Sequence, residues 1–313
     1  MNDRAEDQVI ESGVVELVAV LTAVTDLEAR VLTVAGGRAL PSGPLSPVHR
    51  SLQAGVRAWV ARQTSQPMGY VEQLYTFVDI HRQNAQGLPL LYIGYLGLVN
   101  EANEMVLSGD ARWRDWYEYF PWEDWRAGQP SLIGEVILPR QWAWAEAADS
   151  EALRRARLDR IALCWGLAPY EWSEEQVLLR YELLYETGLI EESPCRQADF
   201  EVGCTGRSMA HDHRRVLATA LSRLRAKIKY RPVIFELMPP QFTLLQLQKS
   251  VEALAGRELH KHNFRRQILH QGLIEAAGDS LESGRGRPAQ LYRFRDDVLL
   301  ERLMSSTRLP VIK

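Results

Sequence analysis

The sequence predicts an α/β domain in which helices sandwich a mixed sheet, followed by a C-terminal helix-turn-helix with a β-hairpin. Residues 14–100 hold several β-branched or alternating apolar segments, typical of strands, around one amphipathic helical segment. Residues 243–294 hold two short helical segments and then two strand segments. The length of 313 residues is sufficient for two domains, each with its own core.

The N-terminal part begins with two predicted strands, VVELVAVLTAV and ARVLTVAGG, joined by a turn at Thr25–Glu28. A proline is favoured in the first turn of a helix, so we expect the next helix to start at Ser46 with Pro47 at its first position. Its buried stripe would comprise Leu52, Val56, Trp59 and Val60. Two strands follow, YVEQLYTFVDI and LPLLYIGYLGLVN.

A tryptophan-rich, helical insertion follows from about residue 100. SEALRRARLDRIALCWGL and SEEQVLLRYELLYETGLI predict helices that each open on a serine cap. These helices either extend the core or form a dimer interface or an arm against the neighbouring domain. We assign residues 1–208 to the first domain and 209–231 to a linker helix, whose apolar face comprises Val216, Leu217, Ala220, Leu221, Leu224 and Ile228.

Residues 232–313 predict a winged helix-turn-helix. Thr243 is a good N-cap for a helix closed by Gly256, and the second helix, LHKHNFRRQILHQ, ends at Gly272. Its apolar residues Phe264, Ile268 and Leu269 would lie on one buried face. GLIEAAG and PAQLYRF predict two strands joined by the loop DSLESGRGR, which would form the wing.

The charge distribution points to a polyanion partner for the C-terminal part. The net charge is only −3, but residues 205–313 hold 20 Lys and Arg against 10 Asp and Glu, whereas residues 1–204 hold 17 against 30. A basic segment attached to an acidic one indicates that the basic one meets a polyanion such as DNA. The alternative is a chance division of solvated surface charge.

A winged helix places its second helix in the major groove with the N-terminal end leading. His262, Asn263 and Arg266 lie at that end and could contact base edges, since Asn suits adenine and Arg suits guanine. Four further cations would neutralise phosphates: Lys261, Arg265, Arg285 and Arg287. The two wing arginines, Arg285 and Arg287, could instead enter the minor groove. Thr243, the N-cap of the first helix, is also a predicted DNA contact. The alternative is a winged helix that binds protein.

Residues 43–65 fit the frame of the loop and helix that bind metal in Nudix hydrolases, G-x5-E-x7-R-E-U-x-E-E-x-G-U. Gly43, Arg57 and Trp59 occupy the glycine, arginine and first hydrophobic positions. Every carboxylate is replaced, because the corresponding residues are His49, Ala58, Ala61 and Arg62, and Thr64 stands at the late glycine. A hard Mg²⁺ ion needs such oxygen ligands, so we predict neither a metal site nor hydrolysis here. Chance agreement of the glycine and arginine is the alternative.

Several segments resemble the Nudix-related transcriptional regulators of NAD metabolism, of the NrtR type. They are YVEQLYTF, DHRRVLATALSRLRAKIKY, FTLLQLQKSVEALAG, HNFRRQIL and GRPAQLYRF. The resemblance covers about residues 14–100 and 209–295, and the long middle segment is more similar to the alphaproteobacterial NadQ branch. It implies a Nudix-like N-terminal domain that has kept ligand recognition without hydrolysis.

The resemblance further implies a homodimeric repressor that binds a palindromic operator before genes of NAD synthesis or salvage. Its effector would be an adenine nucleotide, namely ADP-ribose, NAD or ATP. By position, the implied ligand-binding residues are Arg38, Arg57, Glu72, Tyr75, Asp79 and Arg82. Where the family has a DP-type turn after the YTF strand, this chain has DIHRQ, so it departs from the pattern there.

Composition excludes several other classes. No apolar run is long enough to span a bilayer, the first residues do not resemble a signal peptide, and three scattered cysteines indicate neither a disulfide framework nor zinc. We therefore expect a cytoplasmic protein with no cofactor and no membrane partner. Three rival functions stay open: a Nudix-type ADP-ribose pyrophosphatase fused to a DNA-binding domain, a sugar-responsive regulator on the same scaffold, and a protein-binding adaptor.

Overall fold

The computed structural model describes residues 15–83, 87, 89–101, 106–196, 200–201, 203–230, 233–281 and 289–296. Its larger sheet has the order β4-β5-β1-β2-β6, with a short strand β3 also paired to β1. These strands are β1 Val15–Thr25, β2 Glu28–Thr33, β3 Ser42–Pro44, β4 Tyr70–Gln83, β5 Pro89–Leu98 and β6 Arg112–Asp115. β1 and β5 run parallel and the other pairs antiparallel, so the predicted mixed sheet is confirmed.

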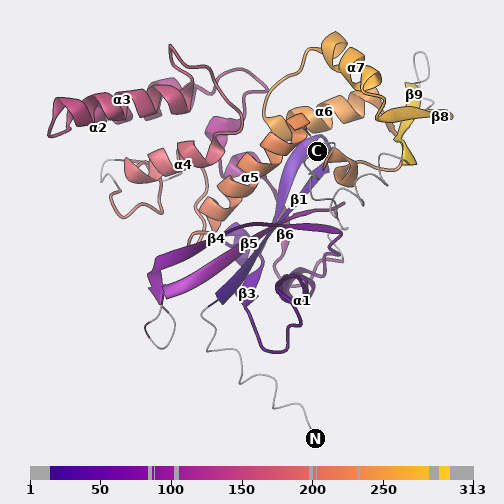
Figure 1. Ribbon diagram of the computed structural model, residues 1–313, viewed down its shortest axis with the longest axis horizontal. Helices are drawn as coiled ribbons and strands as arrows, with labels where there is room; N and C mark the ends of the chain where they lie inside the picture. The colour runs from indigo at the N-terminus through magenta and orange to yellow at the C-terminus, as the bar shows by residue number, and fades with distance from the viewer. Residues whose placement is uncertain are drawn as a thin grey trace, which may run out of the picture.

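Helices cover both faces of this sheet because successive strand residues point to opposite sides. Leu17 and Ala19 of β1 pack with the buried residues of α1, Leu52–Thr64, on one face. Val18 and Val20 belong to the larger core on the other face, which includes α5, His213–Tyr230, and α6, Leu244–Ala255 (Figure 1). The predicted sandwich is therefore confirmed.

The predicted start of α1 at Ser46 is wrong. The amide of Ser46 donates to His49 Nδ1 at 3.1 Å, and the amide of His49 donates back to the Ser46 carbonyl at 2.9 Å. These bonds close a turn ahead of the helix. The helix begins at Leu52, because Ser51 is its N-cap and accepts a hydrogen bond from the amide of Ala54 at 3.1 Å.

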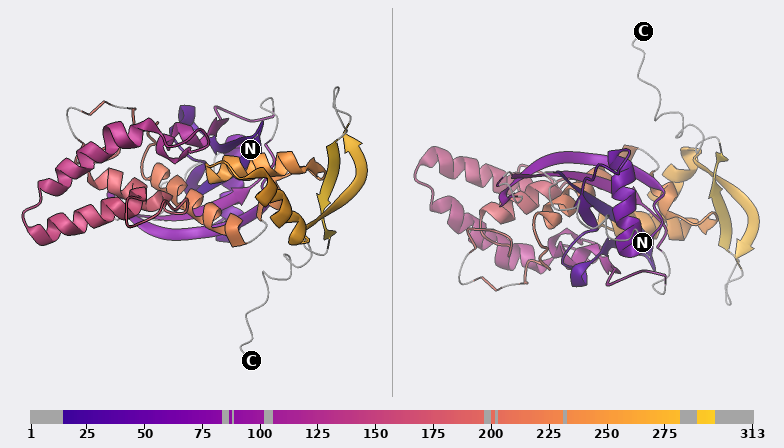
Figure 2. Two further views of the ribbon diagram at one scale, coloured as in Figure 1. Left: turned by 90° about the horizontal axis from the view of Figure 1, so that it is seen from above. Right: turned by 90° about the horizontal axis from the view of Figure 1, so that it is seen from below.

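The tryptophan-rich segment packs into the larger core. Its elements are η3 Trp116–Glu118, η4 Pro121–Glu123, η5 Ile133–Ile137, α2 Leu138–Glu146, α3 Glu151–Trp165 and α4 Val177–Glu186, while a short η2, Ala35–Gly37, precedes β3. Trp116, Trp122 and Trp165 are almost fully buried, which supports the interpretation that the insertion extends the core. The α2–α3 pair also projects from the molecule, at the end opposite the β8–β9 hairpin (Figures 1 and 2).

The two predicted serine caps have different outcomes. Ser150 caps α3 and accepts from the amide of Leu153, as expected. Ser173 does not cap α4, which begins at Val177. The Ser173 carbonyl instead accepts a hydrogen bond from Arg180 at 2.9 Å, so the segment before α4 wraps around a buried guanidinium.

The C-terminal unit has the predicted winged-helix order. After η6, Val233–Leu237, it contains β7 Phe242–Thr243, α6, α7 Lys261–His270, β8 Ile274–Leu281 and β9 Ala289–Phe294, with sheet order β7-β9-β8. Thr243 and Gln246 form a reciprocal capping box at the start of α6, and Gly256 closes that helix with φ +71°. Among the described residues, no helix has the length and apolar character that a bilayer crossing requires.

We expect Thr243→Ala to lower the free energy of unfolding by about 1 kcal/mol, because the hydroxyl accepts the amide hydrogen of Gln246 in the α6 cap. Thr243→Ser keeps that acceptor and should remain within a few tenths of a kcal/mol of the parent chain. Denaturant unfolding followed by circular dichroism measures both. Equal destabilisation by Ser and Ala would contradict the capping role.

Candidate functional site

The second helix of the winged helix, α7, presents a polar outer face. No residue of α7 is buried, and Lys261, His262, Asn263 and Arg266 at its N-terminal end are all exposed. Phe264 and Ile268 pack against the core from the opposite side. The helix is therefore anchored along one side and open to solvent along the other.

The predicted burial of Leu269 is wrong. Its side chain is 48% exposed, because a spacing of four and then three residues places it on the same helix face as His262 and Arg266. An apolar side chain on this face can contact the methyl group of thymine. Sequence reasoning missed this residue, although its spacing from His262 contained the signal.

The exposed end of α7 carries groups suited to DNA. Arg266 Nη2 lies 3.5 Å from Asn263 Oδ1, a long contact that leaves both side chains able to turn toward other partners. Guanidinium and carboxamide groups can each form two hydrogen bonds with one base edge, and Lys261 can neutralise a phosphate. Arg265 is half-buried and is less available than these residues.

The other predicted DNA contacts are placed differently. The Thr243 hydroxyl accepts a hydrogen bond within the α6 capping box, so its first role is in the helix. Arg285 and Arg287 lie outside the residues that the structure describes. The structure thus gathers Lys261, His262, Asn263 and Arg266 at one helix end and leaves the wing arginines as a prediction.

The four predicted effector residues whose side chains the structure describes do not form one group. Arg57 donates to the carbonyl of Gly69 at 2.8 Å and to that of Met68, which ties α1 to the chain entering β4. Arg38 is exposed after η2. Glu72 and Tyr75 lie on the opposite face of the sheet from α1, where they contact α5.

Glu72 is held by α5. Its carboxylate accepts hydrogen bonds from Tyr70 and Lys227 and lies 3.5 Å from Arg223 Nε. Burial alone would raise the pKa of Glu72, but the hydrogen bonds from Lys227 and Tyr70 and the charges of Lys227 and Arg223 outweigh it and lower the pKa. Glu72 therefore fastens β4 to α5.

Tyr75 lines an open cavity of about 430 Å³ between β4, α4 and α5. Its ring stacks on Phe77 at 5.1 Å, and burial raises the pKa of its hydroxyl, which is hydrogen-bonded to Thr219. Arg223, 58% exposed, lines the same cavity. An aromatic ring and a guanidinium here could bind a base and a phosphate. Asp79 and Arg82 belong to β4, but their side chains lie outside the described residues.

The surviving residues of the Nudix frame have packing roles. A side chain at Gly43 would meet the Trp59 ring at 2.2 Å, so the glycine makes room for that ring. Arg62 lies over the same ring, 5.3 Å from its centre. Among the residues described, no group of three or more His, Cys, Asp or Glu side chains could hold a metal ion.

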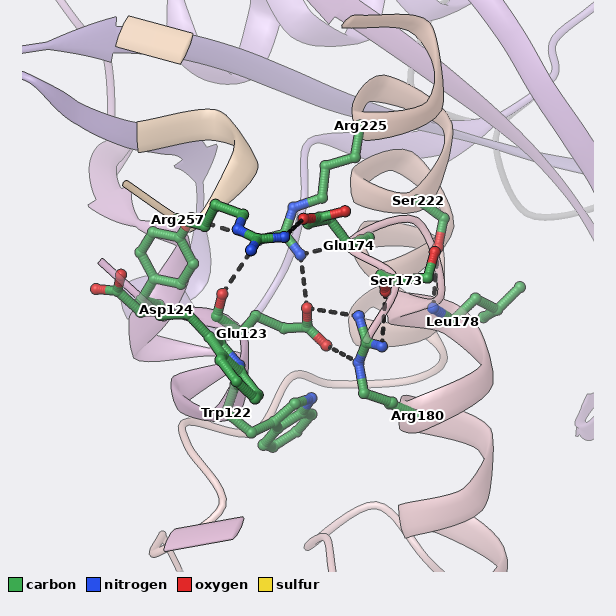
Figure 3. Close-up of polar contacts among 12 residues, drawn as sticks. Trp122, Glu123, Asp124, Ser173, Glu174, Leu178, Arg180, Ser222, Arg225 and Arg257 are labelled. Atoms are coloured by element: carbon green, nitrogen blue, oxygen red, sulfur yellow. Dashed lines mark hydrogen bonds and ion pairs between the residues drawn. The ribbon is translucent and has the colours of Figure 1, made fainter. Parts of the chain in front are cut away.

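Sequence reasoning missed a buried charge cluster where the winged helix meets the rest of the chain. The Glu123 side chain is fully buried, and its carboxylate accepts hydrogen bonds from Arg180 of α4 and Arg225 of α5 (Figure 3). Arg180 Nη2 lies 2.9 Å from Glu123 Oε2. Buried charges need partners of this kind, so the three side chains fix the relative positions of η4, α4 and α5.

The same junction holds the C-terminal end of α6. Arg225 Nε donates to the Leu254 carbonyl at 3.0 Å, and the Tyr117 hydroxyl donates to the Ala253 carbonyl at 2.6 Å. The Trp125 amide donates to the Gly256 carbonyl, also at 2.6 Å. These bonds satisfy carbonyls that a helix end leaves open, and they dock the winged helix through α6 while α7 stays exposed.

Comparison with known proteins shows which family the C-terminal unit resembles. Residues 234–294 match the family model described as the NrtR DNA-binding winged helix domain. The C-terminal unit is thus similar to the winged helix of the NrtR type. A curated relative, the ADPR responsive transcriptional repressor NtrR of Acinetobacter baylyi, is 43% identical over 86 residues, which span 28% of this chain and 34% of that relative.

The fold extends the likeness beyond the NrtR-type winged helix. The crystal structure of Shewanella oneidensis NrtR matches at TM-score 0.52 and 20% identity over 91% of this chain and 95% of that one. The structure of its complex with a 27mer DNA matches with the same TM-score and coverage and 21% identity. A MutT/nudix family protein from Enterococcus faecalis matches at TM-score 0.50 and 14% identity, over 91% of this chain and 89% of that one. A Nudix-like domain joined to a winged helix, the predicted fold class, is thereby confirmed.

We expect Glu123→Gln to lower the free energy of unfolding by about 3–5 kcal/mol, because it leaves two buried guanidinium groups without their counter-charge. Glu118→Gln removes an ion-paired carboxylate of the same segment that is 40% exposed, so its cost should stay below about 1 kcal/mol. Denaturant unfolding measures both changes. Similar losses for the two variants would contradict the importance of the buried cluster.

Proposed function

We propose that the protein is an effector-responsive transcriptional repressor that binds double-stranded DNA through α7 and the β8–β9 hairpin. The observation that carries this proposal is the exposed polar N-terminal end of α7 within an NrtR-type winged helix. The relative from Acinetobacter baylyi is named as an ADPR-responsive repressor, and the Shewanella protein was crystallised with DNA. Both support the same role here.

The repressor would act as a homodimer in the cytoplasm on genes of NAD synthesis or salvage. Its operator would be palindromic, because two copies of α7 related by a two-fold axis meet half-sites about one helical turn, roughly 34 Å, apart. Phosphate contacts would supply much of the affinity, and contacts from His262, Asn263 and Arg266 the sequence preference.

The effector would be an adenine nucleotide, with ADP-ribose the first candidate and NAD and ATP the others. We place it in the cavity that Tyr75 and Arg223 line, where the ring would accept adenine and the guanidinium a phosphate. Thr219, Ser222 and Ala226 of α5 line the same cavity. An effector there would contact α5, and Arg225 of the same helix donates a hydrogen bond to the end of α6 in the winged helix.

We further propose that the Nudix-like domain recognises its ligand without hydrolysing it. Activation of water by Mg²⁺ requires several oxygen ligands, and α1 carries Ala61 and Arg62 where Nudix hydrolases carry metal-binding glutamates. Arg62 would repel a cation at that place. The absence of Mg²⁺-dependent ADP-ribose cleavage by the purified chain is the expected result.

We expect the full chain to shift a palindromic fragment from its own upstream DNA, and one of ADP-ribose, NAD or ATP to change the apparent Kd at least about tenfold. Tyr75→Ala should abolish that response and preserve DNA binding, since Tyr75 belongs to the effector cavity. Tyr170→Ala, at an exposed tyrosine, is the matched control. Failure to shift any such palindrome would refute the proposed function, whereas an effector response that survives Tyr75→Ala would refute only the effector site.

We expect Arg266→Ala to weaken operator binding by about 1–3 kcal/mol and to relax preference at one base pair, because its guanidinium would contact a base edge. Lys261→Ala should weaken binding to all DNA sequences by the same factor and reduce the salt dependence of that binding, as expected for a phosphate contact. Binding to operators randomised at single positions separates the two. If both variants lost the same affinity for every operator sequence, Arg266 would not contact a base edge and the placement of α7 in the major groove would be wrong.

A further inference from the structure

A second cavity lies beneath α7, between the winged helix, the end of α5 and the segment before α4. It has a volume of about 660 Å³, and small-molecule sites commonly have volumes of about 300–1,000 Å³. Most of its lining is apolar and comes from the end of α5, η6, α6, α7 and the adjoining ends of β8 and β9: Ile228, Ile234, Phe235, Leu247, Val251, Phe264, Ile268, Leu273 and Phe294.

The cavity lies along the side of α7 that faces the core. That helix contains no buried residue, and Phe264 and Ile268, which should anchor it, are only half-buried at the cavity wall. The recognition helix therefore spans a hollow that a bound molecule could fill.

One end of the cavity favours negative charge. Arg257, 55% exposed, lines it and is paired with Glu174, while Arg225 beside them is balanced by Glu123. Glu123 also pairs with Arg180, so these five side chains carry one more positive than negative charge. The N-terminus of α7 adds to this field, because His260 makes no side-chain capping bond there and also lines the cavity.

We propose that this cavity is a binding site for a small apolar ring compound bearing one anionic group, such as an aromatic carboxylate. The ring would fill the apolar part, and the anion would meet Arg257 and the N-terminus of α7. Asn263 and Gln267 of α7 line the open side, so an occupant would contact the residues that face DNA. The site is distinct from the Tyr75 cavity, and its occupancy can be measured without DNA.

The fluorescent aromatic anion 8-anilinonaphthalene-1-sulfonate tests the proposal on the full chain. We expect one probe to bind per chain with increased emission. Val251→Trp fills the cavity and should abolish that binding, whereas Leu245→Trp, at a 50% exposed position of the same helix, should preserve it. Arg257→Gln removes an exposed cation at the rim and should weaken binding about tenfold without disturbing the fold.

Equal probe binding by the Val251→Trp and Leu245→Trp chains would place the probe elsewhere and overturn the proposal. Unchanged affinity in Arg257→Gln would overturn the anion preference. Emission that rises only after residues 297–313 are removed would assign the cavity to the chain's own C-terminal segment, which also overturns it. With the site established, saturating probe should change operator affinity in the parent chain and leave it unchanged in Val251→Trp.

Discussion

The buried carboxylate of Glu123 is the constraint on which the arrangement of this chain depends. An unpaired ion in a protein interior costs several kcal/mol, so Glu123 can be buried only when Arg180 and Arg225 reach it together. Those partners stand on α4 and α5, and Arg225 also reaches the end of α6. The position of the winged helix relative to the sheet is therefore set by the same contacts that satisfy one buried charge.

Under the proposed function, this constraint makes α5 the element shared by effector sensing and DNA binding. Thr219 and Ser222 line the Tyr75 cavity, while Arg225, on a different side of the helix, joins the Glu123 cluster. A ligand changes DNA binding only if it favours one arrangement of these parts over another. A small rotation or shift of α5 would alter the Arg225 contacts, and tightly paired buried charges tolerate few intermediate positions. The junction is therefore suited to switching between discrete arrangements.

Local patterns in the sequence predicted most of the fold. The main parts of β1, β2, β4, β5, β8 and β9, the serine cap of α3 and the capped α6 depend on neighbouring residues and were predicted correctly. The short strands β3 and β6 were not predicted, and the strand predicted over residues 29–37 ends at Thr33, before η2. The predicted start of α1 was wrong because the hydrogen bonds between Ser46 and His49 close a turn ahead of the helix, which the apolar pattern does not reveal. The predicted burial of Leu269 was wrong although its spacing from His262 and Arg266 indicated the exposed face of α7. Glu72 and Tyr75 are three residues apart in β4 and would point to opposite faces in a regular strand, but the irregularity between Gln73 and Thr76 turns both toward α5, and such a bulge is not visible in side-chain alternation. In the sequence, Arg180 follows Glu123 by 57 positions and Arg225 follows it by 102. No local pattern connects residues so far apart.

The residues of this chain that match the Nudix frame have roles in packing and none in metal binding that the structure shows. Gly43 and Arg57 are present because the glycine makes room for the Trp59 ring and the arginine holds the carbonyls at the entry to β4. Carboxylates at positions 61 and 62 would repel each other without a cation between them, whereas Arg62 lies over an aromatic ring. These contacts involve no metal ligand, so the packing of α1 on the sheet, which also supports α5, does not depend on a bound metal ion.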